Sequence, residues 1–273
     1  FEAGLLEQVL EVCEGLLEAD PDDVDALYLL GEAMLELEEF EAAHEIFADL
    51  LTLEPDAGGA YNGLGVALFE LCRFEEARDA LSQATELDPR LAEARLYLGY
   101  FHERRGESAA ADACYQRAVE LDPESFHVPR PLTIEQVERA LDQAMRSLPE
   151  RVEAYLTSVE WRIDNLPETS VLRRSIPPAS PLVLCLFEGA QRTAEQMPDP
   201  LLHTPESVTL YAGNLPKMLR DPSDLPRLVA DAVLAELERF LDLDRAEAEA
   251  LGLLGAGVGL PDPDSTPPGR VLH

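Results

Sequence analysis

The chain has 273 residues and a mass of 30.1 kDa, which is enough for one large or two ordinary domains. Hydrophobic residues make up 46% of it, so a packed core is expected and global disorder is excluded. The 54 Asp and Glu residues against 21 Lys and Arg leave a net charge of −33. Such a surface repels nucleic acid and anionic membranes, so the expected partner is a basic segment of another protein.

The acidic residues are spread unevenly. Residues 1–128 hold 31 Asp and Glu against 7 Arg, a net charge of −24. Residues 129–273 hold the remaining 23 acidic residues and 14 basic ones, a net charge of −9. The charge pattern therefore divides the sequence into two parts that are expected to differ in structure.

Three further features bear on the compartment. The four cysteines lie far apart, with no pair spaced as Cys-x-x-Cys, and are expected to be buried thiols in a reducing environment. No stretch comes near the roughly 20 apolar residues of a membrane span. The chain opens on Phe1 without a basic leader. Together these features predict a cytoplasmic protein without membrane insertion.

Four columns of residues recur every 34 residues in the first part. In each unit the small glycine is expected to let two antiparallel helices approach closely, the alanine and the larger residue to fill their interface, and the proline to end the second helix. The columns are Gly31, Gly65 and Gly99; Ala43, Ala77 and Ala111; Phe47, Leu81 and Tyr115; and Pro21, Pro55, Pro89 and Pro123.

This pattern resembles the tetratricopeptide repeat (TPR), including the closing runs LEPD, LDPR and LDPE. Full repeats are predicted over 24–57, 58–91 and 92–125, and residues 1–23 resemble the second helix of a partial repeat. An α-helical solenoid is therefore expected over 1–128. The resemblance implies that its concave face, lined by the first helix of each repeat, binds an extended peptide or a helix of a protein partner.

The resemblance also implies which side chains line this groove. They combine apolar and aromatic centres with carboxylates, which predicts a basic ligand; only Arg104 could hold a C-terminal carboxylate, so a carboxylate clamp is not expected. The alternative is that the aromatic members only pack against neighbouring helices or the second domain. The predicted groove residues are Asp25, Tyr28, Glu32, Leu35, Glu36, Asn62, Val66, Phe69, Glu70, Leu96, Tyr100, Glu103 and Arg104.

After a turn-rich connector at 125–132, residues 129–255 predict a small α+β domain. Thr133 and Gln136 form a capping box for a helix over 133–147, and a short helix is expected around 150–157. Strands are expected at 159–163, 182–189 and 207–213, separated by loops at 164–181 and 190–206. A long helix follows, with Ser223 as its expected N-cap. Its apolar face is expected to hold Val229, Val233, Leu237, Phe240 and Leu241.

These landmarks resemble the minimal zincin-type metallopeptidases over roughly 131–254. The runs that carry the resemblance are LCLFEG at 184–189, PESVTLYAG at 205–213 and LVADAVLAELERFLDLD at 228–244. Such enzymes bind zinc through the two histidines of H-E-x-x-H on one helix, with the glutamate as general base. The matching pentad here has Ala235 and Arg239 at the histidine positions and keeps Glu236. The resemblance thus implies a zincin-like domain that has lost its zinc ligands.

No shift of register restores the motif, because no two histidines are close enough in the sequence. Beyond the pentad, the positions of the family's glycine turn and third ligand are occupied by Asp242, Asp244 and Arg245. A zinc site built from His203, Cys185 and Asp244 is the alternative. Without zinc, Glu236 is expected to lie at a helix surface or to pair with Arg239.

The resulting prediction is a non-catalytic adaptor without a cofactor, a pseudoenzyme in which an acidic TPR groove binds a basic partner segment. The metallopeptidase-like domain would give a second interaction surface, and the Pro-rich tail over 256–273 is expected to be flexible. The first alternative is an active metal-dependent peptidase with an unconventional metal site, to which the repeats recruit substrate. The second is an assembly factor whose repeats self-associate.

Overall fold

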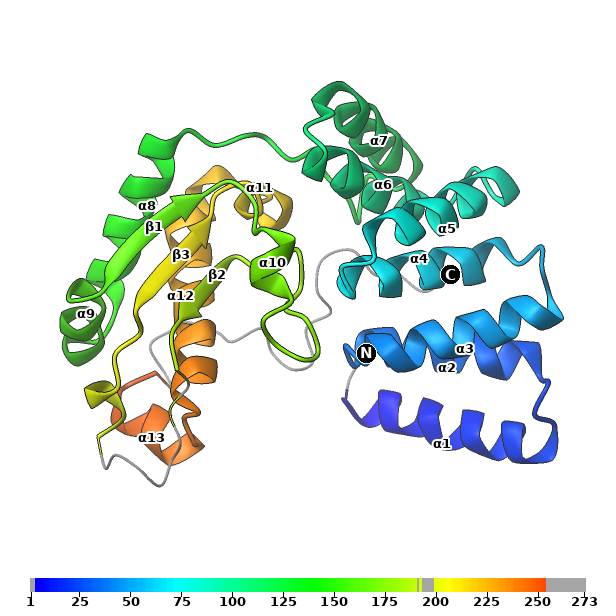
Figure 1. Ribbon diagram of the computed structural model, residues 1–273, viewed down its shortest axis with the longest axis horizontal. Coiled ribbons are helices and arrows are strands. Elements are labelled where there is room, and N and C mark those ends of the chain that lie inside the picture. The colour runs from blue at the N-terminus through cyan, green and yellow to red at the C-terminus, as the bar shows by residue number, and fades with distance from the viewer. Residues whose placement is uncertain (1–2, 191, 193–198, 254–273) are drawn as a thin grey trace. The chain divides into compact units, whose positions relative to one another are not determined.

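The computed structural model describes residues 3–190, 192 and 199–253 (Figure 1). Its contacts divide the chain into two compact units. The first contains residues 1–128 together with Glu168–Pro181, a stretch that we call the inserted segment. The second contains Pro129–Pro167 and the described residues between 182 and 253. None of the helices within the described ranges is long and apolar enough to cross a membrane.

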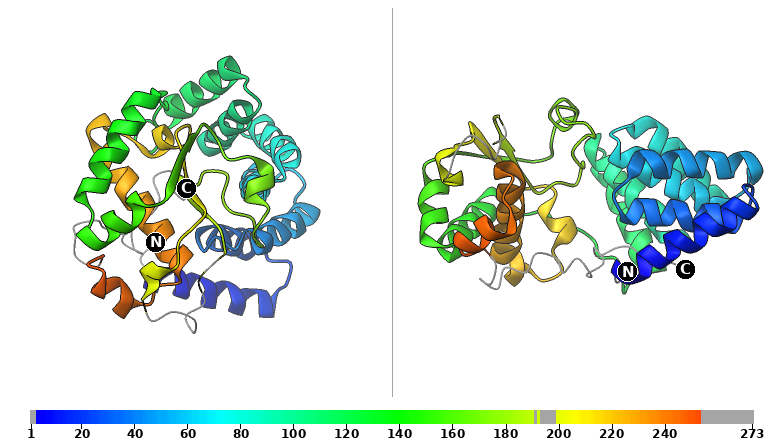
Figure 2. Two further views of the ribbon diagram at one scale, coloured as in Figure 1. Left: turned by 60° about the vertical axis from the view of Figure 1, so that its left-hand side comes forward. Right: turned by 90° about the horizontal axis from the view of Figure 1, so that it is seen from below.

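The first unit is built from α-helices that follow one another in antiparallel pairs. Consecutive helices pack against each other, and α4 also contacts both α2 and α6, so the first helices of the repeats form a common inner layer. Figures 1 and 2 show this stack from three directions. The helices are α1 (Ala3–Ala19), α2 (Val24–Glu36), α3 (Phe40–Leu53), α4 (Gly58–Glu70), α5 (Phe74–Leu87), α6 (Ala92–Arg104) and α7 (Ser108–Leu121).

The repeated glycines are where the paired helices come closest. A methyl group at Gly99 would lie 2.3 Å from Cε1 of Tyr115, far inside van der Waals contact. The larger residue of the column fills the space that glycine leaves, as the sequence predicts. The same pairing joins Gly31 with Phe47 and Gly65 with Leu81.

The second unit contains a three-stranded sheet in the order β1-β3-β2. The central strand β3 runs parallel to β1 and antiparallel to β2, and all five of its residues are buried. The strands are β1 (Glu160–Asp164), β2 (Cys185–Glu188) and β3 (Ser207–Tyr211). The helices are α8 (Ile134–Ser147), α9 (Glu150–Thr157), α11 (Leu215–Met218), α12 (Leu225–Leu241) and α13 (Arg245–Ala250), with short 3-10 turns η1 (Pro200–Leu202) and η2 (Pro222–Asp224).

Helix α12 is central to the packing of this unit. It contacts α8 and β2, and Figure 1 shows it behind the sheet. Its apolar face includes Val229, Val233 and Leu237, each at most 1% exposed. The core that it shares with α8, α9 and the sheet therefore fixes the position of every residue on α12, including the pentad at 235–239.

Several local predictions can be compared with the structure. The capping box of Thr133 and Gln136 is present at the start of α8. Ser223, however, is not the N-cap of the long helix, which begins at Leu225 after Asp224. Ser223 instead lies in η2, where its hydroxyl donates to Asp221 over 2.9 Å. The expected loop at 164–181 also contains a helical turn, α10 (Thr169–Leu172).

Candidate functional site

Most of the predicted groove residues of the TPR array are buried. Tyr28, Glu36, Glu103 and Arg104 are half-buried, and Asp25 is exposed. The buried members are Glu32, Leu35, Asn62, Val66, Phe69, Glu70, Leu96 and Tyr100.

The aromatic residues of this set pack against one another. The ring of Phe69 is fully buried, with its centroid 5.3 Å from those of both Phe74 and Tyr97. Tyr100 lies 5.3 Å from Tyr97 and is only 5% exposed. Phe69 and Tyr100 thus belong to the interior of the array, which is the alternative weighed for them from the sequence. Edge-to-face packing of this kind makes α4 and α6 a rigid support for the polar groups beside them.

Glu70 is the carboxylate of this set with the most clearly defined partners. It lies at the end of α4 and is 5% exposed. Its Oε2 accepts a hydrogen bond from the hydroxyl of Ser180 over 2.6 Å, and its Oε1 accepts a longer one of 3.4 Å from the hydroxyl of Tyr97. A buried carboxylate needs such donors, because its desolvation is otherwise costly. Ser180, in the inserted segment, was not among the residues expected from the sequence.

The inserted segment makes a second polar contact next to Glu70. The guanidinium of Arg173 donates to the carbonyl oxygen of Cys72 over 2.8 Å. Burial raises the pKa of the Cys72 thiol to about 11, so this side chain is a neutral neighbour. The loop at 164–181 is rich in Pro and Arg and carries no net charge, and this contrast with the acidic chain was the available signal.

Two further predicted groove residues lie on the same inner layer. Asn62 donates from Nδ2 to Glu93 over 2.7 Å, while its buried Oδ1 has no hydrogen-bond partner in the described part of the chain. The guanidinium carbon of Arg104 lies 4.3 Å from the ring centroid of Phe74, and burial lowers the pKa of Arg104. Arg104 is therefore held against an aromatic face.

The pentad on α12 holds an ion pair. The carboxylate of Glu236 accepts two hydrogen bonds from Arg239, 2.7 Å from Nε to Oε2 and 2.6 Å from Nη2 to Oε1. Glu236 also accepts the backbone N–H of Phe187 in β2 over 3.2 Å. It is 7% exposed, so the expectation of a surface position was wrong and that of a pair with Arg239 was right. Ala235 and Arg239 are both exposed on α12.

Family models match the two parts of the chain separately. One tetratricopeptide repeat model matches residues 1–64 and 38–90, and a second matches 71–126. A zincin-like metallopeptidase model matches residues 156–253. The chain contains tetratricopeptide repeats and a zincin-like metallopeptidase domain. An array of TPRs supports a role in binding other proteins.

Solved structures of MamA are similar to part of the chain. One, described as the crystal structure of MamA, is 28% identical, has a TM-score of 0.40 and covers 44% of this chain and 70% of its own. MamA from Desulfovibrio magneticus RS-1, residue 41 to the end, is 22% identical, with a TM-score of 0.40, and covers 44% of this chain and 68% of its own. No protein with a curated description matches the sequence.

The zincin-like domain does not bring together the alternative zinc ligands. Cys185 is buried in β2, which raises the pKa of its thiol well above the ordinary value. Asp244 caps α13 through the N–H of Glu247, and Nε2 of His203 contacts the carbonyl oxygen of Ala190. Within residues 3–190, 192 and 199–253, no group of three or more His, Cys, Asp or Glu side chains is placed to hold a metal ion.

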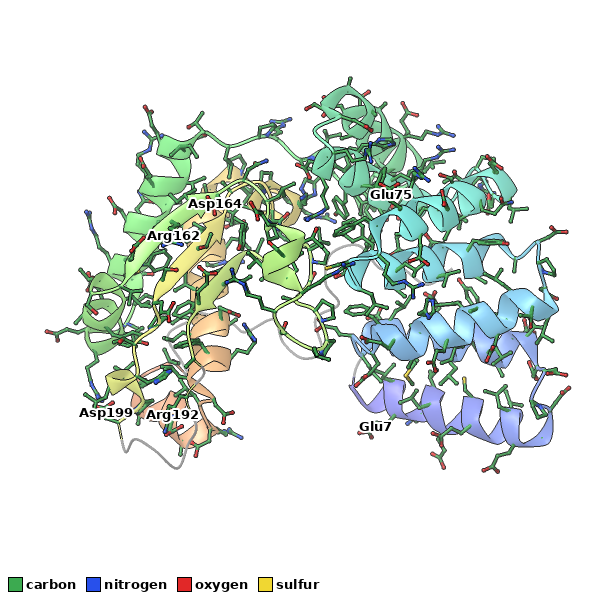
Figure 3. The ribbon with its side chains drawn as sticks, in the orientation of Figure 1. Glu7, Glu75, Arg162, Asp164, Arg192 and Asp199 are labelled. Atoms are coloured by element: carbon green, nitrogen blue, oxygen red, sulfur yellow. The ribbon has the colours of Figure 1, made fainter. Side chains whose placement is uncertain are left out.

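The end of α12 has a polar contact that the sequence did not reveal. Arg192 is 5% exposed and forms a bidentate pair with Glu247, with distances of 2.6 and 3.1 Å. It also donates to the carbonyl oxygen of Leu241 over 3.1 Å, near the C-terminal end of α12, where a cation is favourable (Figure 3). Beyond the pentad, Asp242 adopts a left-handed conformation with φ of 47°. Arg245 is exposed.

Proposed function

We propose that the protein is a non-catalytic adaptor that binds a basic, extended segment of a partner protein on the inner layer of its TPR array. The observation that carries the proposal is the pair of contacts at the end of α4. There, the carboxylate of Glu70 accepts a hydrogen bond from the hydroxyl of Ser180, and the carbonyl oxygen of Cys72 accepts one from the guanidinium of Arg173. Both donors belong to the Arg-containing inserted segment. The net charge of −24 over residues 1–128 favours such ligands over acidic ones.

We further propose that the domain over 129–255 is a pseudoenzyme that provides a second interaction surface. Zinc bound by H-E-x-x-H needs two imidazoles one helical turn apart, and Ala235 and Arg239 occupy both positions. The pair of Arg239 with Glu236 supports the loss of the metal, since the carboxylate that would activate a water binds a guanidinium. The four free cysteines support a reducing compartment such as the cytoplasm.

Selection from a library of random peptides displayed on phage tests the groove. We expect peptides selected on the full chain to be enriched in Arg and Lys, and to bind at least fivefold more weakly to the Glu36→Gln, Glu103→Gln variant. The matched control is Glu41→Gln with Glu45→Gln, which removes the same charge from exposed positions on α3. Selection of acidic peptides, or of a free C-terminal carboxylate, would contradict the proposal.

Zinc content and peptidase activity test the second domain. The protein is purified without a metal-chelating column, incubated with zinc, dialysed and then analysed for bound metal and for cleavage of unstructured peptides. We expect less than stoichiometric zinc and no cleavage that a chelator removes. Stoichiometric zinc with cleavage that is lost in Glu236→Gln would instead establish the active peptidase.

A further inference from the structure

The inserted segment Glu168–Pro181 belongs by its contacts to the TPR unit, although it lies between β1 and β2 in the sequence. It begins with α10, in which Leu172 is completely buried. The segment closes on itself, because the N–H of Ala179 donates to the carbonyl oxygen of Leu172 over 3.0 Å. Between β1 and β2 the chain thus forms a short closed loop that contains α10 (Figure 1).

Both sides of this closed loop meet the end of α4. Ser180 binds Glu70, and Arg173 binds the carbonyl of Cys72. Cys72 has a φ of 58°, which turns the chain sharply after α4, and its Sγ lies 4.0 Å from the carbonyl oxygen of Ala179. Three residues of the inserted segment therefore lie against a site only three residues long on the array.

The middle of the inserted segment is exposed. Residues 173–177 all belong to this exposed stretch, and Ile176 retains 98% of its surface. The charged residues of the segment are two arginines, Arg173 and Arg174, and one glutamate, Glu168. Its net charge is therefore positive, opposite in sign to that of the array. The segment is positively charged and donates a hydroxyl to Glu70, so it resembles the basic external ligand of the proposed function.

We propose that the inserted segment is a cis ligand of the TPR array, and that an external basic, Ser-containing segment must displace it to bind Glu70 and the Cys72 carbonyl. This inference rests on the proposed function and adds to it a competitor within the chain. A tethered ligand acts at an effective concentration in the millimolar range. If the segment binds the array with an intrinsic dissociation constant of about 100 μM, its tethered copy occupies the site in roughly ten chains out of eleven. A free peptide would then bind the closed chain roughly tenfold more weakly than an open one.

The test uses the segment itself as a probe. A fluorescein-labelled peptide of residues 168–181 is titrated with the full chain and with the Arg173→Gln, Ser180→Ala variant, which removes the two polar contacts in cis. We expect fluorescence anisotropy to show about tenfold tighter binding to the variant. Addition of Glu70→Gln to that variant should abolish the gain. The matched control, Arg117→Gln with Ser175→Ala, changes the same residue types at exposed positions and should bind as the unmodified chain does.

A disulfide gives a second, independent test. Ala179→Cys introduces a thiol at the residue whose carbonyl oxygen lies 4.0 Å from Sγ of Cys72. Oxidation is expected to join the two thiols and lock the segment onto the array, and Ala179→Cys with Cys72→Ser is the control. The oxidised form should bind the probe at least tenfold more weakly than the reduced form, and dithiothreitol should reverse the loss. Far-UV circular dichroism verifies that each variant is folded.

The outcomes separate the two proposals. Equal binding to the closed and open chains, with loss on Glu70→Gln, would overturn the cis ligand and leave the basic groove in place. No binding to the open variant would also overturn the cis ligand, because the segment would have no affinity for the array. In that case, selection of basic peptides would still support the proposed function, and selection of acidic ones would overturn it as well.

Discussion

Replacing Arg239 by Met removes the cation beside Glu236 but keeps most of the apolar stem. Of the hydrogen bonds described for the buried carboxylate, only the one from the N–H of Phe187 then remains. We expect the free energy of unfolding of the zincin-like domain to fall by about 2 kcal/mol. The double variant Arg239→Met, Glu236→Gln should cost less than about 1 kcal/mol, because a neutral amide can still accept that N–H without a buried charge.

The magnitude follows from the exposure of the two side chains. Two unit charges about 4 Å apart attract by ~4 kcal/mol at an effective dielectric constant of ~20. Glu236 has 8% of its side-chain surface exposed but Arg239 has 51%, so water screens one side of the pair. Loss of one partner costs about 3–5 kcal/mol in buried pairs, and exposed pairs contribute about 0–1 kcal/mol. An intermediate value is therefore expected.

The chain offers a specific probe for this measurement. Trp161 is the only tryptophan, and it lies in β1 with its Nε1 bound to the carbonyl of Leu156. Its fluorescence during urea denaturation follows the second unit separately from the repeats. Arg151→Met is the control, since its pair with Asp199 is exposed on both sides and should contribute at most about 0.5 kcal/mol. The reasoning is refuted if Arg239→Met costs no more than Arg151→Met.

Three other predictions concern packing, pH and thiol reactivity. Gly63→Ala should lower the stability of the repeats by about 1–2 kcal/mol, because its methyl would lie 2.3 Å from the buried ring of Phe47; Gly15→Ala, with nothing within 4 Å, should raise helix stability by ~0.5–1 kcal/mol, and thermal circular dichroism measures both. The guanidinium of Arg192 holds the pKa of Glu247 below its ordinary value, so this pair stabilises the fold above the ordinary Glu pKa and the benefit is lost as pH falls through the folded pKa. The stability difference between the chain and Arg192→Met should thus shrink in acid, and constant differences in urea titrations from pH 7 to 3 would contradict it. Burial raises the pKa of all four thiols, so alkylation at pH 8 should be slow in the native chain and fast in urea, with the partly exposed Cys114 reacting first.

The repeats could be predicted from the sequence because their signal is periodic. A glycine column and a column of larger residues recur every 34 positions, and the structure pairs them directly, as Gly99 with Tyr115. The capping box was predictable for a different reason, because its two residues, Thr133 and Gln136, lie only three positions apart in the sequence. The prediction of Ser223 as N-cap was wrong because the adjacent residue, Asp224, takes that position. The hydroxyl of Ser223 instead donates to Asp221 within a 3-10 turn.

The contacts of the candidate sites were harder to predict because they join residues far apart in the sequence. Ser180 and Glu70 are 110 positions apart, and Arg192 and Glu247 are 55 apart. Neither pair belongs to a motif. The sequence left open whether Phe69 and Tyr100 line the groove or belong to the core. A helix in the inner layer of a solenoid contacts neighbours on both sides, so a side chain in a groove position can still be buried.

The structure gives Glu236 a physical role that does not depend on a metal. Its carboxylate joins α12 to β2 through the N–H of Phe187, a donor that the sheet leaves available at that position. A buried carboxylate in this place requires a cation, and Arg239, one turn further along the same helix, provides it. Arginine at the second histidine position and glutamate at 236 therefore support each other. Arg239→His would remove the bidentate partner of Glu236, so the variant would need another cation beside this carboxylate for the helix to stay equally stable.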